Sequence, residues 1–161
     1  MRIKVTGFTL IELMVVIAII IILSGVSLAA YFRFSQRQAM MNDARNFSTI
    51  LRRVQAMAKN LVYPSGCSGL SGYRVYSCLN CQNVSAEAMC SSGDVTVIDD
   101  EQVLAKAVFS EAISVVFTAG SGEITPAGEF PISNSSDDYT VVVTTDSNGN
   151  ISTKGYEQYP P

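Results

Sequence analysis

The chain has 161 residues and a formal net charge of −3, a length that fits one modest domain plus an anchoring segment. It contains no histidine and no tryptophan, which excludes histidine-based catalysis and histidine-ligated metal. From Ser35 onward there are 8 basic and 13 acidic residues, a net of −5, and this balance disfavours a nucleic acid partner.

The first predicted element is an apolar helix that follows a short basic leader. The leader holds Arg2 and Lys4, and the run Phe8–Tyr31 has Glu12 as its only charge. A helix of that length spans about 36 Å, which exceeds a hydrocarbon core of about 30 Å. The run is longer than the apolar part of a secretory signal peptide, and no small-x-small cleavage site follows it directly. We therefore predict one membrane span, with the basic end in the cytoplasm and the C-terminal part outside.

The junction between leader and helix carries a motif, Gly7-Phe8-Thr9-Leu10-Ile11-Glu12. It resembles the Gly-Phe-Thr-Leu-x-Glu signature of type IV prepilins and type II secretion pseudopilins. The resemblance implies that a membrane peptidase cuts after Gly7 and methylates Phe8 as the mature N-terminus. It also implies that Glu12 pairs with the Phe8 amine of a neighbouring subunit during assembly. The alternative is that the Glu12 carboxylate only reaches the lipid headgroups.

The helix is predicted to continue as an amphipathic segment over residues 32–60. Its apolar side chains recur at three- and four-residue steps, which predicts a face packed on a sheet, while charged residues such as Asp43 mostly take other faces. Asn60 and the stretch 63–66 are expected to end it. Many pilins carry a proline in the first half, but this chain has only the weak point Ser24-Gly25 there. The predicted stripe is Ala39 or Met40, Ala44, Phe47, Leu51, Val54 and Ala58, widened by Ile50 and Met57.

The residues after Pro64 change to strand and turn patterns. The strongest predicted strand is 139–145, which is β-branched nearly throughout, and the Asn148-Gly149 pair after it predicts a tight hairpin turn. Residues 100–112 are ambiguous, since 105–109 fits either a strand or a short helix. The other predicted strands are 72–77, 94–99, 113–117 and 150–153.

Four cysteines, Cys67, Cys78, Cys81 and Cys90, lie close together in the sequence. An even number of cysteines in an exported domain favours two disulfides, and four cysteines allow three pairings. Zinc is the weaker alternative, because Cys78 and Cys81 form a single CxxC pair whereas zinc knuckles usually need two. The pairing stays open at this point.

Other chemistry is not indicated by the sequence. Asp137-Asp138 and the cluster Asp99-Asp100-Glu101 lack the EF-hand spacing of a calcium loop, and we interpret them as solvated loop charges. No nucleophile motif and no phosphate-cradling glycine loop is present, so neither a catalytic residue, a cofactor nor a metal is predicted.

Together these patterns predict an α+β, pilin-like fold in which a long N-terminal helix packs on a small, mainly antiparallel sheet domain. The segments are a cleaved leader 1–7, a transmembrane or filament-core helix 8–31, its amphipathic continuation 32–60, and an extracytoplasmic β-rich domain 61–161 with a cysteine loop 67–90. The order of elements over 113–154 also resembles the H-type minor pseudopilins of type II secretion and the T-type fimbrial minor pilins.

The resemblance implies a non-enzymatic subunit in the bacterial inner membrane, built into a pilus or pseudopilus that supports secretion or pilus biogenesis. Implied partners are the prepilin peptidase and methyltransferase, other pilin subunits and the inner-membrane assembly platform. The sequence does not choose between a secretion and a pilus role. Two alternatives remain: a competence-type minor pilin that binds DNA through Arg52, Arg53, Lys59 and Arg74, and a membrane-anchored domain of other function.

Overall fold

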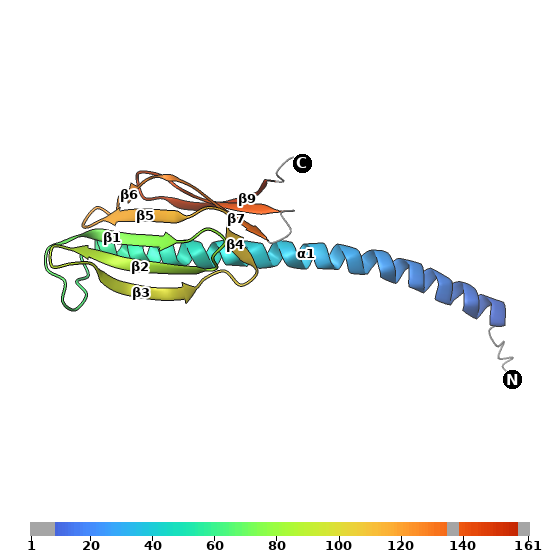
Figure 1. Cartoon of the computed structure of the whole chain (residues 1–161). Coiled ribbons are helices and arrows are strands. Elements are labelled where there is room, and N and C mark those ends of the chain that lie inside the picture. Colours follow the sequence, from blue (N-terminus) through green and yellow to red (C-terminus); the bar gives the residue numbers. More distant parts are fainter. Residues whose placement is uncertain (1–8, 135–138, 158–161) are drawn as a thin grey trace, which may run out of the picture. The chain divides into compact units, whose positions relative to one another are not determined.

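A computed structural model describes residues 9–134 and 139–157. For residues 24–27, 29–30 and 155–157 it describes the backbone only. The described chain is one long helix followed by nine strands, and the predicted α+β class is confirmed (Figure 1). The chain divides into two units, Met1–Arg37 and Gln38–Pro161, and the helix contributes to both of them.

The helix α1 runs over Leu10–Lys59, 50 residues, so the predicted single helix from Phe8 to about Asn60 is confirmed within the described residues. Its C-terminus is closed by two backbone hydrogen bonds, from Leu61 N–H to the Ala58 carbonyl at 3.3 Å and from Val62 N–H to the Met57 carbonyl at 3.1 Å. This is the Schellman arrangement, which places the residue after the cap in the left-handed region. That residue is Leu61, with φ of 50°, where a glycine is more usual.

The strands form two antiparallel sheets in the unit Gln38–Pro161, alongside the C-terminal half of α1 (Figure 1). The five-stranded sheet has the order β3 (Val95–Gln102), β2 (Asn83–Cys90), β1 (Leu70–Ser77), β5 (Ile113–Thr118) and β6 (Ile124–Thr125). The four-stranded sheet has the order β4 (Ala107–Phe109), β7 (Gly128–Asn134), β8 (Thr140–Thr145) and β9 (Ile151–Glu157).

The core lies between α1 and the two sheets. Phe47 on α1 is fully buried and meets Phe109 of β4 and Phe130 of β7 edge-on, with ring centroids 5.0 and 6.2 Å apart. The predicted apolar stripe is confirmed, because its members are buried from Met40 to Ala58 and only Met57 is partly exposed.

The sequence pattern predicted the wrong environment for one charged residue of α1. Asp43 was predicted on a solvent face, but it is only 2% exposed. Its Oδ2 accepts hydrogen bonds from the backbone N–H groups of Lys106 at 2.9 Å and Ala107 at 3.0 Å, at the start of β4. The burial is tolerated because the carboxylate is hydrogen-bonded to two backbone donors that would otherwise lack partners.

The predicted strands correspond to β1, β3, β5, β8 and β9, and the hairpin turn at Asn148-Gly149 is confirmed, with Gly149 at φ of 86°. The ambiguous segment 105–109 contains β4. Two strands of full length were not predicted. β2 is rich in Ala, Ser and Glu, which are weak strand formers, and β7 contains Pro131 in its interior.

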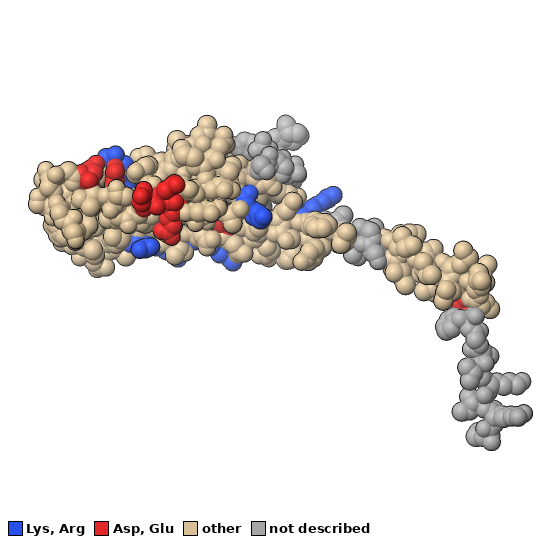
Figure 2. Space-filling model, turned by 60° about the horizontal axis from the view of Figure 1, so that its bottom comes forward, with Lys and Arg blue, Asp and Glu red and all other residues tan. Residues whose placement is uncertain are grey.

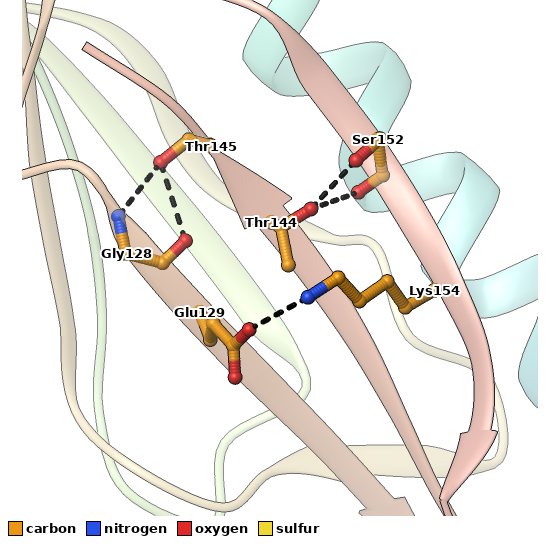
Figure 3. Close-up of polar contacts among 6 residues, drawn as sticks. All are labelled: Gly128, Glu129, Thr144, Thr145, Ser152 and Lys154. Atoms are coloured by element: carbon orange, nitrogen blue, oxygen red, sulfur yellow. Dashed lines mark hydrogen bonds and ion pairs between the residues drawn. The ribbon is translucent and has the colours of Figure 1, made fainter.

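The exposed contacts of the four-stranded sheet are cross-strand pairs (Figure 3). Thr144 Oγ1 and Ser152 Oγ lie 2.6 Å apart across β8 and β9, and Lys154 Nζ lies 3.1 Å from Glu129 Oε1. A directly opposed pair such as Thr144 and Ser152 contributes roughly 0.2–1 kcal/mol and helps to fix the strand register, whereas Glu129 of β7 and Lys154 of β9 meet across β8.

Candidate functional site

The N-terminal turn of α1 is capped by its own sequence motif. Thr9 precedes the helix, and its Oγ1 accepts a hydrogen bond from the Glu12 N–H at 3.3 Å. Thr9 and Glu12 thus occupy the N-cap and N3 positions of the helix, where the Thr9 hydroxyl caps the first turn and a carboxylate is favoured by the helix dipole. Thr9 therefore has a local role as the N-cap of α1 that the motif alone did not reveal. Gly7 and Phe8 lie outside the described residues.

The first turns of α1 expose apolar side chains on every side. Every residue from Leu10 to Leu23 is exposed, and the large apolar ones range from 47% at Val16 to 77% at Leu10. Consecutive exposed positions at 3.6 residues per turn cover the whole circumference of a helix. A helix that is apolar all round is normally buried in protein or lipid, so this surface requires a partner.

A membrane span was predicted over 8–31. Among the described residues, no helix combines the length and apolar character needed to cross a membrane. That part of the expectation stays a prediction.

The four cysteines form two disulfides, Cys67–Cys90 and Cys78–Cys81, with Cα separations of 5.5 and 5.3 Å. The first joins the loop after α1 to the end of β2, and the second closes the turn between β1 and β2. The disulfide hypothesis is confirmed. Of the three possible pairings, the structure has the one in which Cys78–Cys81 lies inside the loop closed by Cys67–Cys90. The zinc alternative is wrong, because no described cysteine is free to bind metal.

Three of the four basic residues proposed for DNA contact, Arg52, Arg53 and Arg74, are engaged with other groups of the fold. Arg74 lies 2.9 Å from Glu87 and 3.9 Å from Asp94, and Arg53 lies 3.9 Å from Glu101. Arg52 donates to the Ile151 carbonyl at 3.1 Å. Figure 2 shows acidic side chains gathered in the middle of one face of the globular unit, with lysines and arginines apart from one another around them. The carboxylates beside Arg53 and Arg74 offset part of the positive charge that a phosphate backbone would require.

The acidic clusters do not build a metal site in the described part of the chain. No group of three or more Cys, Asp or Glu side chains there is arranged to hold an ion. Asp99, Asp100 and Glu101 are exposed on the edge strand β3, where charges discourage edge-to-edge association. Asp137 and Asp138 lie outside the described residues.

Among the described residues, Asp146 and Tyr73 have shifted pKa values. The pKa of Asp146 is lowered, first by the side-chain amide of Asn150 at 2.7 Å and then by the Asn150 backbone N–H at 2.8 Å. The stabilisation from Asp146 is therefore present above its ordinary value and lost as pH falls through the lowered pKa. Burial raises the pKa of Tyr73, whose hydroxyl donates to the Val62 carbonyl.

One known sequence family matches the N-terminal part of the chain, which includes the start of α1. The family model described as the prokaryotic N-terminal methylation motif matches residues 2–28. No curated protein and no solved structure matches the chain. Residues 2–28 thus carry a methylation motif that supports placing this chain in the type IV pilin and pseudopilin superfamily.

Proposed function

We propose that the chain is a minor pilin or pseudopilin, processed after Gly7 and assembled through α1 into a type II secretion pseudopilus or a type IV pilus. The observation that carries this proposal is the methylation motif at residues 2–28, which runs into a helix with apolar side chains exposed all round. A plain membrane anchor explains the apolar surface but gives no reason for the glycine, the phenylalanine and the glutamate at their spacing.

Before assembly the same apolar surface is proposed to lie in the bacterial inner membrane, with the globular unit outside the cytoplasm. The support is the apolar run Phe8–Tyr31 with its single charge, together with the basic leader before it. In the filament, the lipid is replaced by the helices of neighbouring subunits, which present the same apolar surface.

The proposed role of Glu12 is to neutralise the amine of Phe8 in a neighbouring copy. A carboxylate among apolar side chains is costly unless it is paired, and an amine at a helix start is equally in need of a counter-charge. The work of such a subunit is mechanical: it initiates, caps or lengthens a filament. The proposed partners are the prepilin peptidase and methyltransferase, other pilin subunits and the assembly platform. No catalytic role is proposed.

Mass spectrometry of the chain from cells with and without the prepilin peptidase tests the proposal. We expect a peptide that begins at methylated Phe8 in the first strain and an uncut leader in the second. Comparison of sheared filaments with membranes then separates the two systems, because a surface pilus subunit is abundant in the sheared fraction and a pseudopilin or initiator is scarce there. An uncut Met1 leader in both strains contradicts the proposal and leaves a membrane-anchored domain.

A further inference from the structure

An open recess of about 500 Å³ lies on the globular unit, beside the Cys78–Cys81 disulfide. Its volume is within the range of small-ligand sites, roughly 300–1,000 Å³. It lies between the end of β1, the turn 78–82, the start of β2, and Asp100 and Val108. It is remote in sequence from the methylation motif and independent of the proposed assembly role.

The walls of the recess are held in place mainly by backbone hydrogen bonds and by the disulfide. The Asn80 N–H donates to the Phe109 carbonyl at 2.9 Å, and the Phe109 N–H donates to the Cys81 carbonyl at 3.0 Å. The disulfide closes the same turn, and Phe109 is fully buried in the core. Elsewhere in the lining, the Asp100 N–H donates to Ser85 Oγ at 3.1 Å. The turn is therefore ordered before any ligand arrives, which lowers the entropic cost of binding.

Four polar side chains of the lining have no hydrogen-bond partner within the described part of the chain. They are the amides of Asn80 and Asn83, the phenol of Tyr76 and the carboxylate of Asp100. Asn80 and Asp100 have φ of 60° and 46°, in the left-handed region, so two of the four belong to residues held in a sparsely populated backbone conformation. The lining thus offers both donors and acceptors that the fold itself does not consume.

The chemistry of the lining selects a neutral, hydroxyl-rich ligand. Each carboxamide both donates and accepts, as a hydroxyl does, and a carboxylate accepts from two hydroxyls at once. The Tyr76 ring, the disulfide and Val108 supply apolar surface for the C–H face of a sugar ring. The lining contains no lysine or arginine, which disfavours a phosphate or a sialic acid. A single exposed carboxylate is a weak basis for recognising a cation.

From this arrangement we propose that the recess around the Cys78–Cys81 turn is a binding site for neutral saccharide units, contacted by Tyr76, Asn80, Asn83 and Asp100. Because the recess is open, the affinity for one or two sugar units is weak, with a dissociation constant of about 1–10 mM. Repetition along a filament would strengthen attachment to a glycan surface by avidity.

A titration of the full chain, monitored by the side-chain amide resonances of Asn80, Gln82 and Asn83, tests the site. The protein is held in a detergent without a sugar headgroup, and the probes are maltose, lactose and chitobiose. Glucosamine and glucuronate serve as cationic and anionic probes. We expect saturable shifts of these amides with at least one neutral disaccharide, insensitive to salt because no net charge is paired.

The variant pair Asn80→Asp with Asn83→Asp removes the amide donors, and aspartate tolerates the left-handed conformation found at position 80. We expect it to weaken sugar binding at least tenfold, whereas Asn60→Asp, an exposed asparagine outside the recess, leaves it unchanged. Unchanged aromatic resonances of Phe109 show that the turn is intact. The proposal is overturned if no neutral sugar shifts the amides, if only glucosamine does so, or if the double variant binds as well as the wild type.

Discussion

The side-chain amide nitrogen of Gln55 lies 2.7 Å from the carbonyl oxygen of Gly149, so α1 directly holds the hairpin turn between β8 and β9. The same nitrogen donates to the Gly122 carbonyl at 3.1 Å, and Gln55 is 8% exposed. One polar side chain of the helix therefore joins two turns that come from different sheets.

Gln55→Ala is expected to lower the free energy of unfolding of the globular unit by about 1–3 kcal/mol, because two carbonyl oxygens lose their donor. The thermal transition followed by near-UV circular dichroism measures the loss. Gln38→Ala is the matched control, since Gln38 is exposed on the same helix. A Gln55→Ala transition equal to that of the control contradicts the assignment.

The Cα of Gly149 packs closely against the same Gln55 side chain. A Cβ at this position would lie 2.3 Å from Gln55 Nε2, and φ is 86°. Gly149→Ala is therefore expected to cost more than the roughly 1 kcal/mol of left-handed strain alone. In the double variant with Gln55→Ala part of that cost should disappear, and a double-mutant cycle without coupling would show that the contact is not formed.

Asp43 should be the most sensitive charged position of α1. Asp43→Ala leaves the Lys106 and Ala107 N–H groups without an acceptor and is expected to cost about 2–4 kcal/mol, whereas Asp43→Asn keeps one acceptor oxygen and costs less. Hydrogen exchange of those two amides reports the local effect. Equal exchange rates in the wild type and Asp43→Ala are incompatible with this account.

Leu61→Gly is expected to stabilise the chain. Leu61 carries the left-handed strain of the helix terminus at φ of 50° and is 46% exposed, so the substitution removes strain and sacrifices little burial. We expect a gain of about 0.5 kcal/mol after the entropic cost of glycine is subtracted. Asn60→Gly, one residue earlier and without a positive φ, should have the opposite sign, and denaturant unfolding of the two variants decides it.

The two disulfides should differ in what they stabilise. In the chain-entropy model, Cys67–Cys90, with a sequence separation of 23, contributes about 3 kcal/mol, and Cys78–Cys81, with a separation of 3, contributes about 2 kcal/mol. Paired serine variants of each bridge should therefore lower the melting temperature by different amounts, the first more. The reverse order would show that the short bridge acts through the native packing of the turn against β4 instead.

Much of the fold follows from local patterns, and the misses have physical causes. The α1 stripe and the strands β1, β5 and β8 have strong periodicity or β-branched composition, so the sequence predicts them. Pro131 argues against a strand, because proline has no backbone N–H to donate. In the structure its carbonyl accepts from the Ser110 N–H, just beyond the end of β4. The side of β7 on which the N–H is missing therefore lies past the end of the neighbouring strand, where no sheet hydrogen bond is needed.

Only part of the candidate site could be predicted from the sequence. The methylation motif is contiguous and can be recognised from the sequence alone. The burial of Asp43 and the grouping of Asn80 and Asn83 in the recess depend on contacts between residues far apart in the chain, which the sequence does not show. The spacing Thr-x-x-Glu at residues 9–12 could have predicted the helix cap at Thr9. We interpreted these residues only as part of the prepilin-like motif.

Helix capping by Thr9 and the proposed pairing of Glu12 can be separated by substitution. Glu12→Gln keeps a side chain accepted at the N3 position of a capping box but removes the charge that pairs with an amine. Thr9→Ala does the opposite, because it removes the capping hydroxyl and leaves the Glu12 carboxylate in place.

The most direct test of assembly through α1 is the fraction of mature chain found in sheared filaments rather than membranes, for the wild type, Glu12→Gln and Thr9→Ala. We predict normal processing in all three, a loss of filament incorporation of at least tenfold in Glu12→Gln, and near wild-type incorporation in Thr9→Ala. Equal incorporation of Glu12→Gln and the wild type, or an equal loss in both variants, contradicts pairing of Glu12 with a neighbouring N-terminal amine.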